Sequence, residues 1–165
     1  MTFYLGIEVA YLVKHLLMLG AGFKARSHRG YTYYTRGIER SQGDAQQDGK
    51  CPILFLHGVG LGLLPYITFV FRLASTDHPV VAVESSHLGM RWVSDVPSED
   101  EVVDVIVEVM DRLELPSAAV VAHSYGTFMA SRLVQRQPSR VQSLALLDPV
   151  CFIMFDGGML LLHED

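Results

Sequence analysis

Residues 120–127 read Val-Val-Ala-His-Ser-Tyr-Gly-Thr, and this stretch decides how the chain is interpreted. It places Ser124 at the end of an apolar run, with Ala122 on one side and Gly126 on the other. A chain that turns from a buried strand into a helix within one residue brings its two flanks close together, so the flanking residues must be small. The pattern therefore predicts that Ser124 lies on a tight turn between a strand and a helix.

A second motif lies upstream, where residues 52–60 read Pro-Ile-Leu-Phe-Leu-His-Gly-Val-Gly. This is the pattern of a short strand buried on both faces, as in parallel sheets, followed by a glycine-containing loop. A catalyst of acyl transfer needs two backbone N–H groups aimed at the developing oxyanion. Tyr125, just after the serine, and Val59, in this loop, are the candidate donors. The supporting loop residues are His57, Gly58 and Gly60.

Together the two motifs resemble the α/β-hydrolase family, over roughly residues 30 to 150. The resemblance implies a mostly parallel sheet with flanking helices. It also implies a serine hydrolase that acts on an ester, amide or related acyl bond, with Ser124 as nucleophile and Val59 and Tyr125 as oxyanion donors. In this family an acid and then a histidine follow the nucleophile along the chain.

The acid and the histidine are harder to place. Asp148, at the tip of the next expected strand, is a candidate acid, although aspartate before proline also commonly starts a turn. His163 is the only histidine after Asp148, and it lies close to the end of the chain, where termini fray. The sequence therefore resembles the amino-terminal part of the family's fold, truncated after the strand that follows Ser124.

Two functions stay open at this point. The first is a serine hydrolase, with this chain alone hydrolysing esters very slowly or not at all because a base is missing. The second is a catalytically silent module or fragment of the same fold, with a binding role or none. Another histidine beyond Asp165 would favour the first.

Strands and helices are expected to alternate along the chain, which is typical of an α/β fold with right-handed crossovers. Ser98 and Glu101 form a capping box that predicts a helix start. The expected strands are residues 31–34, 52–56, 79–83, 118–122 and 141–147, and the expected helices are residues 64–74, 99–113 and 125–137. We divide the chain into an amino-terminal helix (1–26), a partial hydrolase core (27–150) and an apolar tail (151–165).

The amino-terminal helix is amphipathic. Its apolar residues Leu5, Val9, Leu12, Leu16 and Leu19 share one side, and its polar residues share the other, namely Glu8, Tyr11, Lys14 and His15. Residues 3–23 therefore suit a helix lying on a membrane surface or one covering the protein's own core. The internal charges disfavour a spanning helix, and the absence of an initial positive charge disfavours a signal peptide. We expect an intracellular protein, cytoplasmic or membrane-associated, and not a secreted one.

Composition sets further limits. The chain has 165 residues, half of them hydrophobic, which suits one domain. The net charge of −5 and the lack of a basic run argue against nucleic acid as a partner. Two distant cysteines indicate a reducing compartment, and no cofactor or metal is expected. We expect a small-molecule substrate with a hydrophobic acyl group, although the aromatic residues that suggest it would also suit a core. We also expect exposed apolar area at the amino-terminal helix and at residues 152–162.

Overall fold

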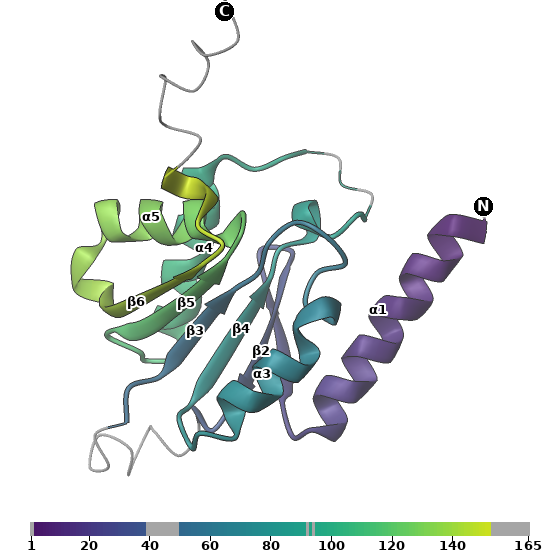
Figure 1. Ribbon diagram of the computed structural model, residues 1–165, viewed down its shortest axis with the longest axis horizontal. Helices are drawn as coiled ribbons and strands as arrows, with labels where there is room; N and C mark the ends of the chain where they lie inside the picture. Colours follow the sequence, from purple (N-terminus) through teal and green to yellow (C-terminus); the bar gives the residue numbers. More distant parts are fainter. Residues whose placement is uncertain (1, 39–49, 92, 94, 153–165) are drawn as a thin grey trace, which may run out of the picture.

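Six strands form one mixed sheet in the order β1-β2-β4-β3-β5-β6. The computed structural model describes residues 2–38, 50–91, 93 and 95–152 (Figure 1). Strands β3 to β6 run parallel, and β2 is antiparallel to both of its neighbours. The strands are β1 (Lys24–His28), β2 (Tyr31–Arg36), β3 (Ile53–Leu56), β4 (Val80–Glu84), β5 (Ala118–His123) and β6 (Val141–Leu147). The predicted α/β fold with a mostly parallel sheet is confirmed.

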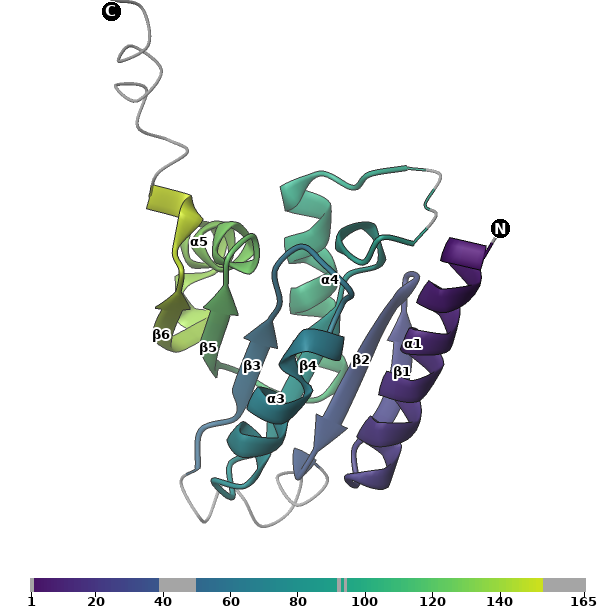
Figure 2. The same cartoon turned by 45° about the vertical axis from the view of Figure 1, so that its right-hand side comes forward.

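Helices cover both faces of the sheet. Figures 1 and 2 show α1 and α3 on one face and α4 and α5 on the other. Two separate clusters of buried side chains fill the space between the helices and the two faces. The α-helices are α1 (Thr2–Gly20), α3 (Ile67–Ala74), α4 (Glu99–Arg112) and α5 (Gly126–Arg136), and the short 3-10 helices are η3 (Leu64–Tyr66), η4 (Ser86–Leu88), η5 (Pro138–Arg140) and η6 (Val150–Phe152).

The predicted capping box starts α4. The Ser98 hydroxyl accepts a hydrogen bond from the Glu101 backbone N–H at 3.3 Å, and the Glu101 carboxylate accepts one from the Ser98 N–H at 2.8 Å. Two amide donors of the first turn thereby gain partners that the helix itself cannot provide.

The amino-terminal segment differs from the sequence interpretation. The helix ends at Gly20, and Lys24–His28 form strand β1, so the boundary drawn at residue 26 falls inside a strand. The sequence Lys-Ala-Arg-Ser-His lacks the alternation of apolar and polar residues that identifies a strand. A two-residue turn joins β1 to β2, with positive φ at both Arg29 (46°) and Gly30 (81°), as type I′ hairpins require.

Helix α1 exposes the apolar row that the sequence places on one of its sides. Its buried side carries Ile7, Tyr11, Lys14 and Met18, whereas the apolar row is exposed to solvent. The exposed fractions of that row are Leu5 66%, Val9 51%, Leu12 57%, Leu16 58% and Leu19 43%. The helix does pack on the domain, with a mixed side on which Tyr11 and Lys14 lie between the apolar Ile7 and Met18. Within the described chain, none of the helices combines the length and the apolar content that crossing a bilayer needs.

Candidate active site

Ser124 lies on the single-residue turn between β5 and α5, as predicted. Its φ of 49° is in the left-handed region, which costs a residue with a side chain of order 1–3 kcal/mol. The next residue, Tyr125, is already helical, with φ −57° and ψ −29°. The strand therefore becomes a helix at Ser124 itself, and the half-buried serine stands at the carboxyl end of the sheet.

Close backbone approach explains the glycines around Ser124. A Cβ atom on Gly58 would lie 2.8 Å from the Cβ of Ser124 and 3.2 Å from the carbonyl oxygen of His123. One on Gly126 would lie 2.9 Å from the carbonyl oxygen of His57. Larger residues at either position would push the β3 loop away from the serine. The loop and the turn are thus at the same end of the sheet, which the hydrolase interpretation requires.

His57 anchors the loop after β3. Its Nε2 atom accepts a hydrogen bond from the Ser85 backbone N–H at 3.0 Å, so its Nδ1 atom carries the proton and donates to the Gly58 carbonyl oxygen at 2.7 Å. The ring is only 2% exposed, and burial lowers its pKa below the ordinary value of 6.5. Both nitrogens are occupied, so His57 positions the loop and is not the base for Ser124.

A pair that sequence reasoning missed lies beside the serine. The Tyr66 hydroxyl accepts a hydrogen bond from the Gly58 backbone N–H at 3.3 Å and lies 2.9 Å from the Nδ1 atom of His123. The two rings meet edge to face, 5.3 Å apart. Tyr66 belongs to η3, far from Ser124 along the chain, so no local spacing could have revealed the contact. The pair fixes the Gly58 amide and the imidazole of His123.

Among the described residues, the two amides proposed as oxyanion donors have no competing acceptor. The Gly58 amide bonds to Tyr66, whereas those of Val59 and Tyr125 donate to no protein atom in the part of the chain that the structure describes. Val59 is 62% exposed and directly follows the glycine that touches Ser124. Gly60, which donates its own amide to the Leu88 carbonyl oxygen at 2.9 Å, ties the loop to η4. Their role as oxyanion donors stays a prediction.

Asp148 lies next to the serine turn along the sheet edge. The carbonyl oxygen of Leu147, at the end of β6, accepts a hydrogen bond from the Ser124 backbone N–H at 3.0 Å. Asp148 follows with φ 50°, and its own carbonyl oxygen accepts from the Val150 N–H at 3.0 Å, so it starts a turn. Among the described residues, no histidine bonds to its carboxylate. His163 lies outside the described residues, and the catalytic role of Asp148 stays a prediction.

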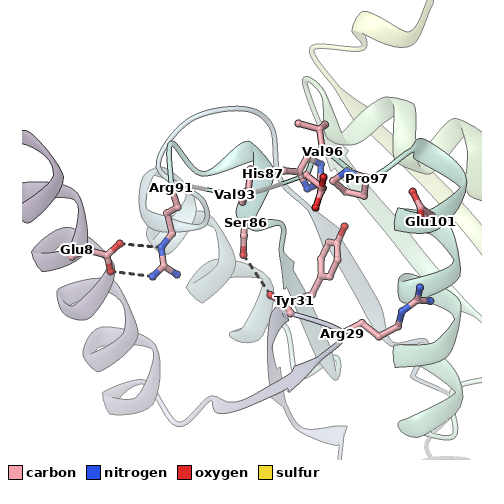
Figure 3. Close-up of a pocket in the computed structure, with 12 residues that line it drawn as sticks. Glu8, Arg29, Tyr31, Ser86, His87, Arg91, Val93, Val96, Pro97 and Glu101 are labelled. Atoms are coloured by element: carbon pink, nitrogen blue, oxygen red, sulfur yellow. Dashed lines mark hydrogen bonds and ion pairs between the residues drawn. The ribbon is translucent and has the colours of Figure 1, made fainter.

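A cavity of about 840 Å³ lies at the same end of the sheet, but Ser124 does not line it. Figure 3 shows Tyr31, Ser86 and His87 around it, with Glu8 of α1 and Arg91 closing one side through hydrogen bonds of 3.2 and 3.0 Å. The buried Tyr31 hydroxyl has no hydrogen-bond partner among the described residues, and burial raises its pKa. Ser86 follows β4 and Ser124 follows β5, and β3 lies between these two strands, so the cavity and the serine are at the same end of the sheet but separate from each other.

The chain matches the sequence model of the alpha/beta hydrolase fold over residues 51–160. It is 31% identical over 112 residues to abhydrolase domain-containing protein abhd-5.2 of Caenorhabditis elegans, covering 65% of this chain and 25% of the relative. It is 34% identical over 105 residues to 1-acylglycerol-3-phosphate O-acyltransferase ABHD5 of Rattus norvegicus, covering 61% of this chain and 30% of the relative. The chain thus spans about a quarter to a third of the length of these curated relatives.

A solved structure supports the same fold. The crystal structure of a membrane phospholipase A, described as a bacterial virulence factor, superposes with a TM-score of 0.63 at 17% identity, over 88% of this chain and 46% of that one. At this identity the likeness establishes the fold. With the family match over more than half of its residues and Ser124 on the strand–helix turn, the chain belongs to the α/β-hydrolase fold family.

Proposed function

We propose that this chain carries the nucleophile and the oxyanion donors of a serine hydrolase that acts on an ester, amide or related acyl bond. The observation that carries the proposal is the backbone conformation of Ser124, which has a φ of 49° between β5 and α5. Gly58 approaches it so closely that a Cβ atom there would lie 2.8 Å from the Cβ of Ser124. Strain of this kind persists only where the surrounding structure imposes it, and it clusters at functional sites.

The proposed reaction begins with attack of the Ser124 Oγ atom on the acyl carbon, while a base takes the hydroxyl proton. The carbonyl π electrons move to the oxygen, and the N–H groups of Val59 and Tyr125 stabilise the resulting negative charge. The tetrahedral intermediate then collapses, and the leaving alcohol or amine takes the proton from the base. Water repeats these steps on the acyl-serine and releases the acid.

No described histidine is hydrogen-bonded to the Ser124 hydroxyl, and we propose that the base comes from outside the described residues. His57 is buried with both nitrogens bonded, and His123 is engaged with Tyr66. The relatives are three to four times longer than the matched region, which leaves room in them for a histidine that this chain would need. His163 and residues of a longer polypeptide or a partner are the candidates.

The substrate proposal is a small molecule with a hydrophobic acyl group. It is supported by the relative that is named as an acyltransferase of 1-acylglycerol-3-phosphate. The aromatic residues of η3 and α3 do not add to this support, because they pack on the core: the ring centroids of Phe55 lie 5.3 Å from Tyr66 and 5.5 Å from Phe69.

A silent module is the second candidate function. The observation that favours it is that no histidine bonds to the Ser124 hydroxyl in residues 2–38, 50–91, 93 and 95–152. A serine without a base retains only the contribution of the oxyanion donors and of substrate binding, a loss of about a millionfold relative to a complete nucleophile–base unit.

Chemical rescue distinguishes the two candidates. Free imidazole is added as an external base, and the cleavage of p-nitrophenyl esters of increasing acyl length is followed for the unaltered chain, Ser124→Ala and the matched control Ser86→Ala. We expect imidazole to accelerate cleavage by the unaltered chain and the control well above the rate with Ser124→Ala, which reports imidazole's own hydrolysis.

Each outcome decides between the candidates. Equal rates for the unaltered chain and Ser124→Ala, at every imidazole concentration, would establish the silent module. Fast cleavage without imidazole that disappears in Ser124→Ala would show that the chain contains its own base, and His163→Ala would then test the one histidine downstream of Asp148.

A further inference from the structure

The β3 loop, residues 57–63, is tied to the end of β4 and to η4 by hydrogen bonds. The Gly60 N–H donates to the Leu88 carbonyl oxygen at 2.9 Å. At the end of the loop, the Leu63 N–H donates to the Oε1 atom of Glu84 at 3.0 Å. This second bond has a carboxylate acceptor, and a charge-assisted hydrogen bond is roughly twice as strong as a neutral one. Glu84 is therefore the stronger of these two attachments.

The β3 loop bends closely around the Glu84 side chain, which is buried. Gly62 has a φ of 59°, and a Cβ atom at this position would overlap the Oε1 atom of Glu84. The same Cβ atom would lie 2.9 Å from the Tyr11 hydroxyl. Only glycine suits both this conformation and this space. The path of the loop and the position of the carboxylate thus depend on each other.

Lys14 of α1 provides the counter-charge for Glu84. Its side chain is 2% exposed, and its ammonium group forms an ion pair with the Oε2 atom of Glu84 and donates to the Tyr34 hydroxyl at 2.9 Å. The two carboxylate oxygens therefore have separate partners, the Lys14 ammonium group and the Leu63 amide. A buried carboxylate without a counter-charge is strongly unfavourable, so Lys14 allows Glu84 to occupy this position.

Helix α1 also contacts the segment that follows β4. The Tyr11 hydroxyl donates a hydrogen bond to the Gly89 carbonyl oxygen at 2.7 Å, and a Cβ atom on Gly89 would overlap that hydroxyl. The helix ends at Gly20, whereas the family model matches residues 51–160. An element outside the matched region thus supplies the counter-charge and a second contact for a loop inside it.

The Val59 amide lies between two amides that are hydrogen-bonded. Gly58 donates to the Tyr66 hydroxyl at 3.3 Å, and Gly60 donates to the Leu88 carbonyl oxygen. The Val59 side chain is 62% exposed, so its own packing does little to orient the backbone. The direction of the Val59 N–H therefore depends on how the rest of the loop is held.

We infer that Glu84 and Lys14 are positioning residues, which hold the β3 loop so that the Val59 N–H stays directed at the serine turn. Glu84 holds the Leu63 amide, and Lys14 holds Glu84; we call this arrangement the loop clamp. The inference rests on the proposed function, in which Val59 is an oxyanion donor. Such a donor must lie within about 2.7–3.1 Å of the oxyanion, so a small shift of the loop would reduce its effect.

Two double variants separate the hydrogen bond of the loop clamp from its charges. Lys14→Met with Glu84→Leu, the test variant, removes both charges and the acceptor for the Leu63 amide. Lys14→Met with Glu84→Gln, the rescue variant, removes the same charges, but the glutamine oxygen can still accept that hydrogen bond. Neither variant leaves a buried charge unpaired, and circular dichroism checks that both are folded.

Hydrogen exchange measured by mass spectrometry tests the clamp without any substrate. We expect peptides that cover residues 57–63 to exchange about fivefold faster in the test variant than in the rescue variant, since one neutral hydrogen bond is worth about that factor. Peptides that cover β6 should exchange equally in the two variants. A general loss of stability would instead accelerate exchange in both regions.

Cleavage of p-nitrophenyl esters with added imidazole tests the effect on chemistry. We expect kcat of the test variant to be about ten- to a hundredfold below that of the rescue variant with KM unchanged, because an oxyanion donor acts in the transition state. The rescue variant should recover most of the kcat of the unaltered chain. A residue with a merely structural role would not separate the two variants in this way.

Two results would overturn the inference. One is equal exchange of residues 57–63 in the test and rescue variants, and the other is faster exchange in the test variant with an equal kcat. A different result, no imidazole-dependent cleavage by the unaltered chain above the rate with Ser124→Ala, would refute the proposed function. The exchange comparison alone would then support or overturn the loop clamp.

Discussion

Helices α1 and α4 both carry apolar and polar residues, yet they present different mixtures to the sheet. Helix α4 buries its apolar residues, among them Val103, Ile106 and Val109, and turns its carboxylates outward. Asp100 and Asp104 meet Arg132 and Arg136 of α5, each at 2.7 Å. Helix α1 buries Lys14 and Tyr11 together with Ile7 and Met18, and it exposes its leucines.

The difference follows from what each helix finds on the sheet. Helix α4 lies on a face of apolar side chains, so the hydrophobic effect sets its rotation. Helix α1 lies over Glu84, a carboxylate buried at the end of β4, where an unpaired charge is far more costly than an exposed leucine. A helical wheel shows that a helix has two faces, but the partner on the sheet decides which face turns inward.

Removal of the lysine should have the largest effect. Lys14→Ala leaves Glu84 buried without its ion-pair partner, and we expect a loss of about 3–5 kcal/mol in the free energy of unfolding. Urea denaturation followed by circular dichroism measures it. If the loss stays below about 1 kcal/mol, the buried pair does not set the rotation of α1.

A double variant separates the charge from the packing. Lys14→Met with Glu84→Gln removes both charges and keeps the side-chain volumes, so it should recover much of the stability that Lys14→Ala loses. Failure to recover it would show that the hydrogen bonds of Glu84, including the one from the Leu63 N–H at 3.0 Å, matter more than its charge.

Truncation of one apolar residue on each helix should change the free energy of unfolding by very different amounts. Ile106→Ala on α4 removes a side chain that is 1% exposed, and we expect a loss of about 2–5 kcal/mol. Leu12→Ala on α1 removes one that is 57% exposed, and we expect a change within about 0.5 kcal/mol. The same denaturation experiment checks both, and similar losses would mean that the apolar row of α1 is buried in solution.

The sequence predicted the parts of the fold that local patterns determine. The small residues around Ser124 predicted the strand–helix turn, since a turn this tight needs small flanking residues and the structure leaves no room for a Cβ atom at Gly126. Ser98 and Glu101 predicted the start of α4 because a capping box is complete within one turn of chain. Glycine at position 58 was assigned to a loop near the serine, and the structure places it in contact with Ser124.

Contacts between distant segments were not predictable. The Tyr66–His123 pair joins η3 to the end of β5, and the Lys14–Glu84 pair joins α1 to the end of β4. Nothing in the local sequence marks Glu84 as buried. The helical wheel of α1 therefore gave no reason to predict that Lys14 faces the sheet. Strand β1 was missed for a related reason, because an edge strand with exposed residues needs no apolar alternation.

Acid should weaken α4 through its cap, with a smaller effect than those of Lys14→Ala and Ile106→Ala. Hydrogen bonds from the Ser98 backbone and side chain hold the pKa of Glu101 below its ordinary value of 4.5. As the pH falls, the unfolded chain therefore takes up the proton first, so the stabilisation is complete above pH 4.5 and is lost as the pH falls through the lower, folded pKa. Helix α1 has no carboxylate in its first turn and lacks this dependence on a cap.

Melting temperatures measured between about pH 6 and pH 3 test this dependence. Glu101→Gln should flatten the decline, because glutamine can still accept the hydrogen bond from Ser98 but does not titrate. Glu114→Gln, at an exposed carboxylate just after α4, is the matched control and should leave the decline unchanged. An equal slope in both variants would show that the exposed carboxylates of α4 do not hold its amino-terminal turn. In that case its packed apolar face alone would distinguish α4 from α1.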